Sequence, residues 1–263
     1  MKLEAVVVCI NYGDFLAVTL PANKGQFDRM VVVTTPDDIE TIEVCKKNGV
    51  KWIETNDVYK DGPVANKAIA INKGLDYLSK DGWVLQLDAD IWLPPMTRAI
   101  LEKLPLNDDS IYGIDRYMCD SYKEWYTFIN NNKEIYGGYV FMNMSHFKIG
   151  HRVNQYYGDG YMPIGFFQLW NPSKSGTWTY PVELSGYDRT DVVHLKQFAR
   201  DKRKFIPELV CVHLASETTE LGQNWKGRKT KRFEMPNIHD LVCSEYVVKG
   251  FADIPKDYPG VND

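Results

Sequence analysis

Four apolar runs of strand length recur along the first 95 residues. They occupy residues 4–11, 28–36, 51–56 and the start of 83–94, and most of them are rich in β-branched side chains. A run that is apolar at nearly every position, rather than at alternate ones, is typical of a strand buried on both faces, as in a parallel sheet. The pattern therefore predicts four such strands in this part of the chain.

Helical patterns fill the gaps between these runs. Residues 37–49 carry apolar side chains on one side and end in an Asn-Gly pair that stops a helix. Residues 61–82 hold an apolar stripe at helical spacing, formed by Val64, Ala68, Ile71, Leu75 and Leu78. Alternating strands and helices predict a doubly wound parallel sheet, whose ligands bind outside the carboxyl ends of the strands.

The alternation fades after Pro95. A short helix is expected over residues 97–104, followed by a stretch rich in aromatic residues and glycine with two strand-like runs, 138–144 and 165–170. A last apolar run, residues 206–214, contains His213 near its end. Because no Ser- or Pro-rich linker and no repeat separates these parts, we expect one domain with two halves, residues 1–95 and 96–263.

Composition narrows the class of protein. The chain has 263 residues, of which 44% are hydrophobic, and this is enough to form a stable core without disulfides or a structural metal. Its five cysteines stand singly with no C-x-x-C pair, which indicates a reducing compartment. No apolar stretch approaches the roughly 20 residues of a bilayer span, so we expect a cytoplasmic protein. The net charge of −4 argues against a protein that binds polyanions over its whole surface.

Asp88 and Asp90 form the only Asp-x-Asp of the sequence, at the end of the fourth strand. On an extended chain both carboxylates point to the same face, and two like charges there favour a bound cation. Oxygen ligands suit Mg²⁺ or Mn²⁺, which in turn bind phosphates. The alternative is a pair of hydrated acids in a turn.

Together these motifs resemble the GT-A nucleotide-sugar glycosyltransferases, in their family 2-like form, which includes bacteriophage enzymes. The resemblance is carried by four short β-α units without a G-x-G-x-x-G fingerprint, by Asp88-Ala89-Asp90, and by the preceding helix that begins Asn66-Lys67. It implies a single GT-A domain in which residues 1–95 bind the nucleotide sugar. Residues 96–263 would supply an aromatic-rich acceptor side and complete the metal site. The donor contacts that it implies are Val8, Asn11, Thr35, Asp37, Asn66, Lys67 and Asp88.

A second set of acids lies in residues 185–195. In inverting members of this class, an acid that opens a helix just past the sheet deprotonates the acceptor hydroxyl, and Asp191 before Val192-Val193 resembles that position. Asp188 is the substitute candidate for this catalytic base. The structural alternative is that Asp191 is only an N-cap or a first-turn acid of a helix.

The resemblance also implies that a histidine after the last sheet strand completes the metal site. The ligands of Mn²⁺ or Mg²⁺ would then be Asp88, Asp90 and His213. The alternative is that His213 is a core residue whose ring nitrogens are satisfied by hydrogen bonds within the protein. Residues 222–228 resemble the family's diphosphate-facing loop, which makes Lys226 and Arg228 candidate contacts of the diphosphate.

The expected function is a metal-dependent glycosyltransferase that moves a sugar from a UDP-sugar to a hydroxyl acceptor by an inverting displacement. Two basic clusters, in residues 196–204 and 226–232, favour an anionic acceptor. The specific hypothesis is a hydroxymethylated base in phage DNA, which would place the protein in the host cytoplasm. One alternative is a sugar-1-phosphate nucleotidyltransferase, although the first strand is not followed by the Gly-rich basic loop of those enzymes. The other is a non-catalytic module that binds sugar or nucleic acid.

Overall fold

The first part of the fold alternates strands and helices as the sequence predicts. The computed structural model describes residues 1–60, 65–131, 134–136, 148–149, 161–183, 190–215, 224, 227–233 and 247–249. The order in the first part is β1 (Leu3–Val8), α1 (Gly13–Asn23), β2 (Arg29–Thr34), α2 (Ile39–Asn48), β3 (Lys51–Glu54), α3 (Lys67–Tyr77), β4 (Trp83–Asp88) and β5 (Ile91–Trp92). Two 3₁₀ turns, Lys24–Gln26 and Asp57–Tyr59, lie in the connections.

The second part contributes longer strands and short helices. Its elements are α4 (Thr97–Lys103), β6 (Ile111–Cys119), α5 (Tyr122–Asn131), β7 (Glu134–Tyr136), β8 (Lys148–Ile149), β9 (Phe167–Trp170), α6 (Pro172–Ser175), α7 (Thr190–Leu195), a 3₁₀ turn Arg200–Lys202, β10 (Arg203–Leu214) and β11 (Val247–Lys249). The helix expected over residues 97–104 and the strand expected over 206–214 are therefore confirmed. The strand expected at residues 138–144 lies outside the described residues. The helix expected to start at residue 61 begins instead at Lys67, because Asn66 caps it.

Both parts build one sheet. Its order is β3-β2-β1-β4-β9-β6-β10-β5, with β8 paired to β6, while β7 and β11 pair with each other in a separate two-stranded sheet. Strands β1, β2, β3 and β4 pair in parallel, and β10 pairs in parallel with β6. Strand β9 runs antiparallel to both of its neighbours, β4 and β6, so the carboxyl ends of β1, β4, β6 and β10 lie along the same edge.

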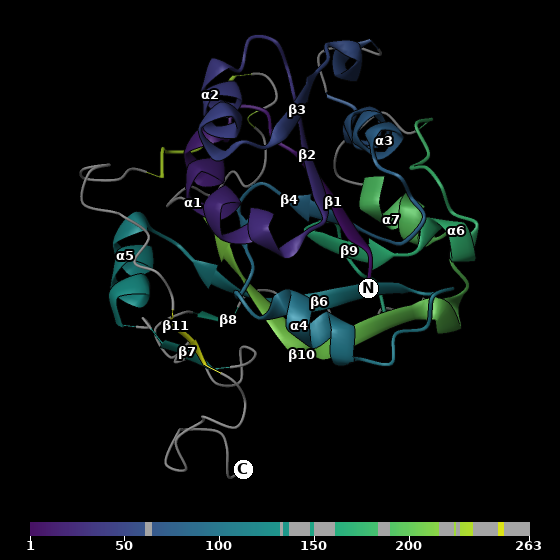
Figure 1. Ribbon diagram of the computed structural model, residues 1–263. Coiled ribbons are helices and arrows are strands. Elements are labelled where there is room, and N and C mark those ends of the chain that lie inside the picture. The colour runs from purple at the N-terminus through teal and green to yellow at the C-terminus, as the bar shows by residue number, and fades with distance from the viewer. Residues whose placement is uncertain are drawn as a thin grey trace.

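Helices cover both faces of this sheet (Figure 1). On one face, Leu16 and Leu20 of α1 and Cys45 of α2 pack against alternate residues of the central strands. On the other face, Ile71 and Leu75 of α3 and Leu195 of α7 do the same. Side chains of successive strand residues point to opposite faces, which explains why strands between two helical layers are apolar at nearly every position.

Candidate active site at the carboxyl ends of the strands

A pocket of about 240 Å³ opens where β1, β4 and β6 end, next to the first turns of α3 and α7. Its polar lining consists of Tyr12, Lys67, Gln86, Asp88, Asp90, Arg116, Thr190 and Asp191. Apolar side chains, among them Val8, Ile71 and Phe166, complete the walls. Five of the residues predicted from the sequence, Val8, Lys67, Asp88, Asp90 and Asp191, therefore meet in one cavity at the expected edge of the sheet.

Asp88 ends β4 and is held by two side chains. The Lys67 ammonium lies 2.5 Å from its Oδ1, and Gln86 Nε2 donates to the same oxygen at 3.1 Å. Lys67 is the first residue of α3, and the preceding Asn66 caps that helix by accepting a hydrogen bond from the Ala68 amide at 3.1 Å. Burial acts to lower the pKa of Lys67, but Asp88 holds it above its ordinary value, so the ammonium stays charged.

Asp90 faces the other way, toward β10. The chain turns at Ala89-Asp90 into β5, which pairs antiparallel with β10 so that Ile91 lies opposite His213. The His213 Nε2 lies 3.1 Å from Asp90 Oδ2, and both side chains are largely buried. Burial acts to raise the pKa of Asp90, but the imidazole and then the Lys67 ammonium bring it below its usual value. The carboxyl group of Asp90 is therefore ionised at neutral pH.

The Asp90–His213 pair fits a divalent cation, whereas Asp88 does not join it. Asp90 Oδ1 and His213 Nδ1 are buried without a hydrogen-bond partner among the described residues. Two ligands at right angles, each about 2.1 Å from a metal, lie about 3.0 Å apart, close to the separation of Nε2 and Oδ2. In the described part of the chain no group of three metal-binding side chains converges. The geometry thus favours two protein ligands rather than the predicted three, with the remaining positions left to phosphate and water.

Asp191 lies on the opposite wall, in the first turn of α7. Its Oδ2 accepts a hydrogen bond from the Gly165 amide at 2.7 Å, and its Oδ1 accepts one from the Val192 amide at 2.8 Å. Burial raises the pKa of Asp191, while these two amides and Lys67 act to lower it. The carboxylate is thus oriented and desolvated, which suits a general base. The predicted substitute, Asp188, lies outside the described residues.

Several polar residues of this lining were not predicted as site residues, among them Arg116 and Tyr12. Arg116 of β6 stacks its guanidinium on the Phe166 ring, 4.7 Å from the centroid, and it makes no ion pair with any described residue. Its Nε is buried without a hydrogen-bond partner there, as is the hydroxyl of Tyr12. The available signal for Arg116 was a lone cation near the end of a mostly apolar and aromatic strand, although it follows an acid, Asp115. Tyr12 gave no such signal.

Other predicted donor contacts serve the fold. Asn66 is 1% exposed and is used as the cap of α3, with its Nδ2 donating to the Val182 carbonyl at 2.9 Å. Thr35 and Asp37 follow β2 and are absent from the lining of this pocket. Asn11 donates its side-chain amide to the Asn224 carbonyl at 2.9 Å. Of the four donor contacts predicted at the ends of the first two strands, Val8, Asn11, Thr35 and Asp37, only Val8 lines the cavity.

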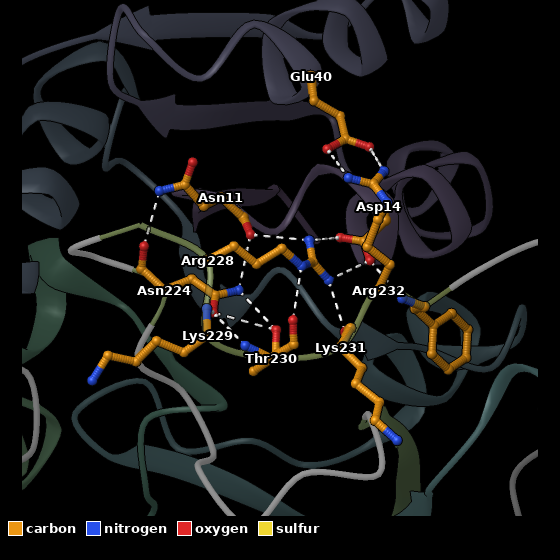
Figure 2. A network of polar contacts seen from close by, with 10 residues as sticks. Asn11, Asp14, Glu40, Asn224, Arg228, Lys229, Thr230, Lys231 and Arg232 are labelled. Carbon is orange, nitrogen blue, oxygen red and sulfur yellow. Dashed lines mark hydrogen bonds and ion pairs between the residues drawn. The ribbon is translucent and has the colours of Figure 1, made fainter.

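Arg228 takes a structural role instead of the predicted diphosphate contact. Figure 2 shows its guanidinium beside Asp14, with Nη1 and Nη2 at 2.7 and 2.6 Å from the two carboxylate oxygens. Its remaining N–H groups donate to the carbonyls of Asn11, Thr230 and Lys231. All five donors of the guanidinium are therefore used within the protein. The other predicted contact, Lys226, lies outside the described residues.

Comparisons with known proteins agree on the fold. No protein-family model matches the sequence, and no curated protein sequence matches it. Mannosyl-3-phosphoglycerate synthase from Rubrobacter xylanophilus superposes with a TM-score of 0.50 at 14% identity, over 84% of this chain and 68% of that one. A mycobacterial protein superposes with a TM-score of 0.50 at 12% identity, over 81% and 67%. Glucosyl-3-phosphoglycerate synthase from Mycobacterium tuberculosis gives 0.49 at 13%, over 81% and 71%. The chain has the predicted GT-A fold, a single α/β domain around a mostly parallel sheet.

Proposed function

We propose that this protein is a metal-dependent glycosyltransferase that moves a sugar from a UDP-sugar to a hydroxyl group of an acceptor. One observation carries the proposal: Asp90, which is paired with His213, and the desolvated Asp191 line the same pocket at the carboxyl ends of the strands. A cation-binding pair suits a departing diphosphate, and a buried carboxylate suits the proton of an attacking hydroxyl. The fold is one that is known to carry such chemistry.

On the donor side, Asp90 Oδ2 and His213 Nε2 would hold Mn²⁺ or Mg²⁺. When bound, the cation supplies positive charge to the oxygens of the leaving diphosphate. Lys67 lies within 2.5 Å of Asp88 and adds a second positive charge near the diphosphate. Asp88 orients that ammonium and, in this arrangement, acts on the donor through Lys67 rather than as a metal ligand.

On the acceptor side, Asp191 would act as the base in a single displacement with inversion. The acceptor oxygen forms a bond to the anomeric carbon of the sugar while the bond from that carbon to the diphosphate oxygen breaks. The hydroxyl proton passes to the Asp191 carboxylate, and UDP leaves with the bonding electron pair. Hydrogen bonds from Gly165 and Val192 fix the carboxylate for this transfer.

Arg116 supports an anionic acceptor. Its guanidinium faces the same pocket without an ion-pair partner among the described residues, and Phe166, on which it stacks, is next to the Gly165 that holds Asp191. The Rubrobacter protein is by name a synthase of a mannosylated phosphoglycerate, a small anionic compound. We propose a small phosphorylated or carboxylated alcohol as the acceptor here.

A DNA base as acceptor has less support. The basic clusters that suggested it are partly used within the fold, because Arg228 binds Asp14, Arg232 binds Glu40, and Lys202 binds Asp109. The Rubrobacter protein bears the name of a phosphoglycerate enzyme, not of a DNA-modifying one. Incubation with hydroxymethylcytosine DNA and UDP-sugars, followed by nucleoside mass analysis, tests this acceptor directly.

The metal site is the part of the proposal to test first. Calorimetric titration of the full chain with UDP should give binding with Mn²⁺ present and none after EDTA treatment. Asp90→Ala and His213→Ala should each weaken UDP binding in Mn²⁺ at least about tenfold, because each removes one of two protein ligands. A coupled assay of UDP release from UDP-sugars should show a loss of about a hundredfold or more for Asp90→Ala.

Asp57→Asn is the matched control, because Asp57 is an exposed acid paired with Lys73 outside the pocket. It should bind UDP as the natural sequence does. Metal-independent UDP binding, or full activity of Asp90→Ala, would contradict the proposed function. A protein that bound sugars without UDP or metal would instead match the binding-module alternative.

A further inference from the structure

Tyr12 brings into the pocket a hydroxyl group that the described protein does not use. The residue lines the cavity with Asp88 and Asp90, and its phenol oxygen is buried without a partner among the described residues. Burial, and then Asp90 and Asp88, raise the pKa of Tyr12, so the hydroxyl keeps its proton. A buried unpaired donor is destabilising, and a ligand with an acceptor oxygen would relieve this cost.

The residue before it, Asn11, has an uncommon backbone conformation. Its φ is +59°, in the left-handed region, where residues other than glycine are rare and asparagine is among the most frequent. The Asn11 amide donates to Asp38 Oδ2 at 2.7 Å, which fixes one side of this peptide. Because the Asn11 dihedrals set the direction in which the chain leaves β1, they also set where Tyr12 lies.

The other side of Asn11 is fixed by two residues far along the chain, Asn224 and Arg228, which we call the clasp. Asn224 Nδ2 donates to the Asn11 carbonyl at 2.9 Å, and Asn11 Nδ2 returns a bond of 2.9 Å to the Asn224 carbonyl (Figure 2). Arg228 Nη1 adds a contact to the Asn11 carbonyl at 3.4 Å. The clasp thus holds both the backbone and the side chain of the left-handed residue.

The clasp is itself rigidly built. Asn224 is fully buried, and its Oδ1 accepts hydrogen bonds from the Lys229 and Thr230 amides at 2.9 and 3.1 Å. Arg228 is anchored on Asp14, a buried residue in the first turn of α1, and Asp14 also accepts the Phe233 amide at 2.6 Å. A charge-assisted bidentate pair of this kind is among the stronger hydrogen-bonded contacts in proteins.

We infer that the clasp is a positioning device for Tyr12, and that Tyr12 donates its hydroxyl hydrogen bond to a phosphate oxygen of the metal-bound nucleotide. A phosphate is the fitting partner because the hydroxyl lies near both acids of the Asp-x-Asp, where the cation and its phosphates gather. This inference rests on the proposed function for its ligand. It adds that nucleotide binding depends on a segment remote from the pocket, since Asn224 and Arg228 themselves do not line it.

The test is a double-mutant cycle read by calorimetric titration of the full chain with UDP in Mn²⁺. Tyr12→Phe removes only the hydroxyl and should weaken UDP binding about tenfold or more, because a hydrogen bond to a charged phosphate is stronger than one between neutral groups. Asn224→Asp keeps the acceptor oxygen for Lys229 and Thr230 but loses the donor to Asn11, and it should weaken binding by a similar factor. The double variant should be no weaker than either single variant, since both remove the same contact.

Glu40→Gln is the matched control, because Glu40 pairs with Arg232 of the same segment yet has no contact with Asn11. It should bind UDP normally. The inference is overturned if Tyr12→Phe binds UDP as the natural sequence does, or if the single losses multiply in the double variant. If Asn224→Asp is unfolded at the temperature of the titration, Arg228→Lys, which breaks the bidentate pair, replaces it in the cycle. Absence of metal-dependent UDP binding in the natural sequence would instead refute the proposed function.

Discussion

Gly165→Ala should reduce turnover because it displaces the proposed base, Asp191, while leaving its carboxylate chemically unchanged. A Cβ at position 165 would lie 2.8 Å from Asp191 Cβ and 3.1 Å from its Cγ and Oδ2. Ordinary contacts begin near 3.4 Å, so Asp191 or the Gly165 loop must shift by about 0.6 Å (3.4 − 2.8). Because Gly165 has no positive φ, alanine adds this clash and no backbone strain.

The size of the effect follows from that shift. Overpacking of this kind costs about 1–3 kcal/mol of stability. A misplacement of about 1 Å in a catalytic group can cost roughly a hundredfold in rate, so about 0.6 Å should lower kcat some tenfold or more. The assay is UDP release at saturating UDP-sugar, with thermal denaturation to confirm folding and Gly25→Ala as control, since no atom lies within 4 Å of a Cβ there.

Two results would refute this reasoning. Unchanged kcat in folded Gly165→Ala would mean that Asp191 is not the base, or that it does not depend on Gly165 for its position. A further drop when Gly165→Ala is added to Asp191→Asn would mean that the substitution acts elsewhere, since a base already removed cannot be displaced.

Two predictions concern pH. Burial raises the pKa of Asp191 above the ordinary 3.8, and the base must be ionised to accept a proton. We therefore expect kcat/KM to fall as the pH drops toward that raised pKa. A pH–rate profile should show this acidic decline for the natural sequence and not for Asp191→Asn. Burial also lowers the pKa of His194 to about 3, below the 6.5 of the unfolded chain, so its contribution to stability is present above pH 6.5 and is lost as pH falls toward 3. Protonation of His194 should lower the free energy of unfolding by about 2 kcal/mol between pH 7 and pH 5. His194→Phe keeps a ring against Tyr180, and its urea unfolding should show a smaller loss of stability over that interval than the natural sequence does.

Much of the fold could be predicted because the apolar runs of β1, β2 and β4 leave few alternatives. A strand buried between two helical layers must be apolar on both faces, and this is visible in the sequence without any knowledge of neighbours. The same reasoning located Asp88 and Asp90, since the carboxyl ends of parallel strands share an edge. The antiparallel placement of β9 between β4 and β6 could not be predicted, because strand order depends on pairings between residues far apart in the chain.

The site was harder to predict where the partner of a side chain decides its role. Asp88 and Asp90 look equivalent in sequence, yet one faces Lys67 of α3 and the other faces His213 of β10. Arg228 looked like a free cation in a basic run, but Asp14, 214 positions away in the chain, takes up its charge. Tyr12 and Arg116 became candidates only when burial showed that they lacked partners.

The antiparallel strand β9 has a consequence for what this pocket can hold. By separating the ends of β4 and β6, it places Asp88 and Arg116 on strands two sheet spacings apart, roughly 10 Å, instead of one. In the proposed reaction, the position of β9 would therefore set the distance between the donor side of the pocket at Asp88 and the acceptor side at Arg116.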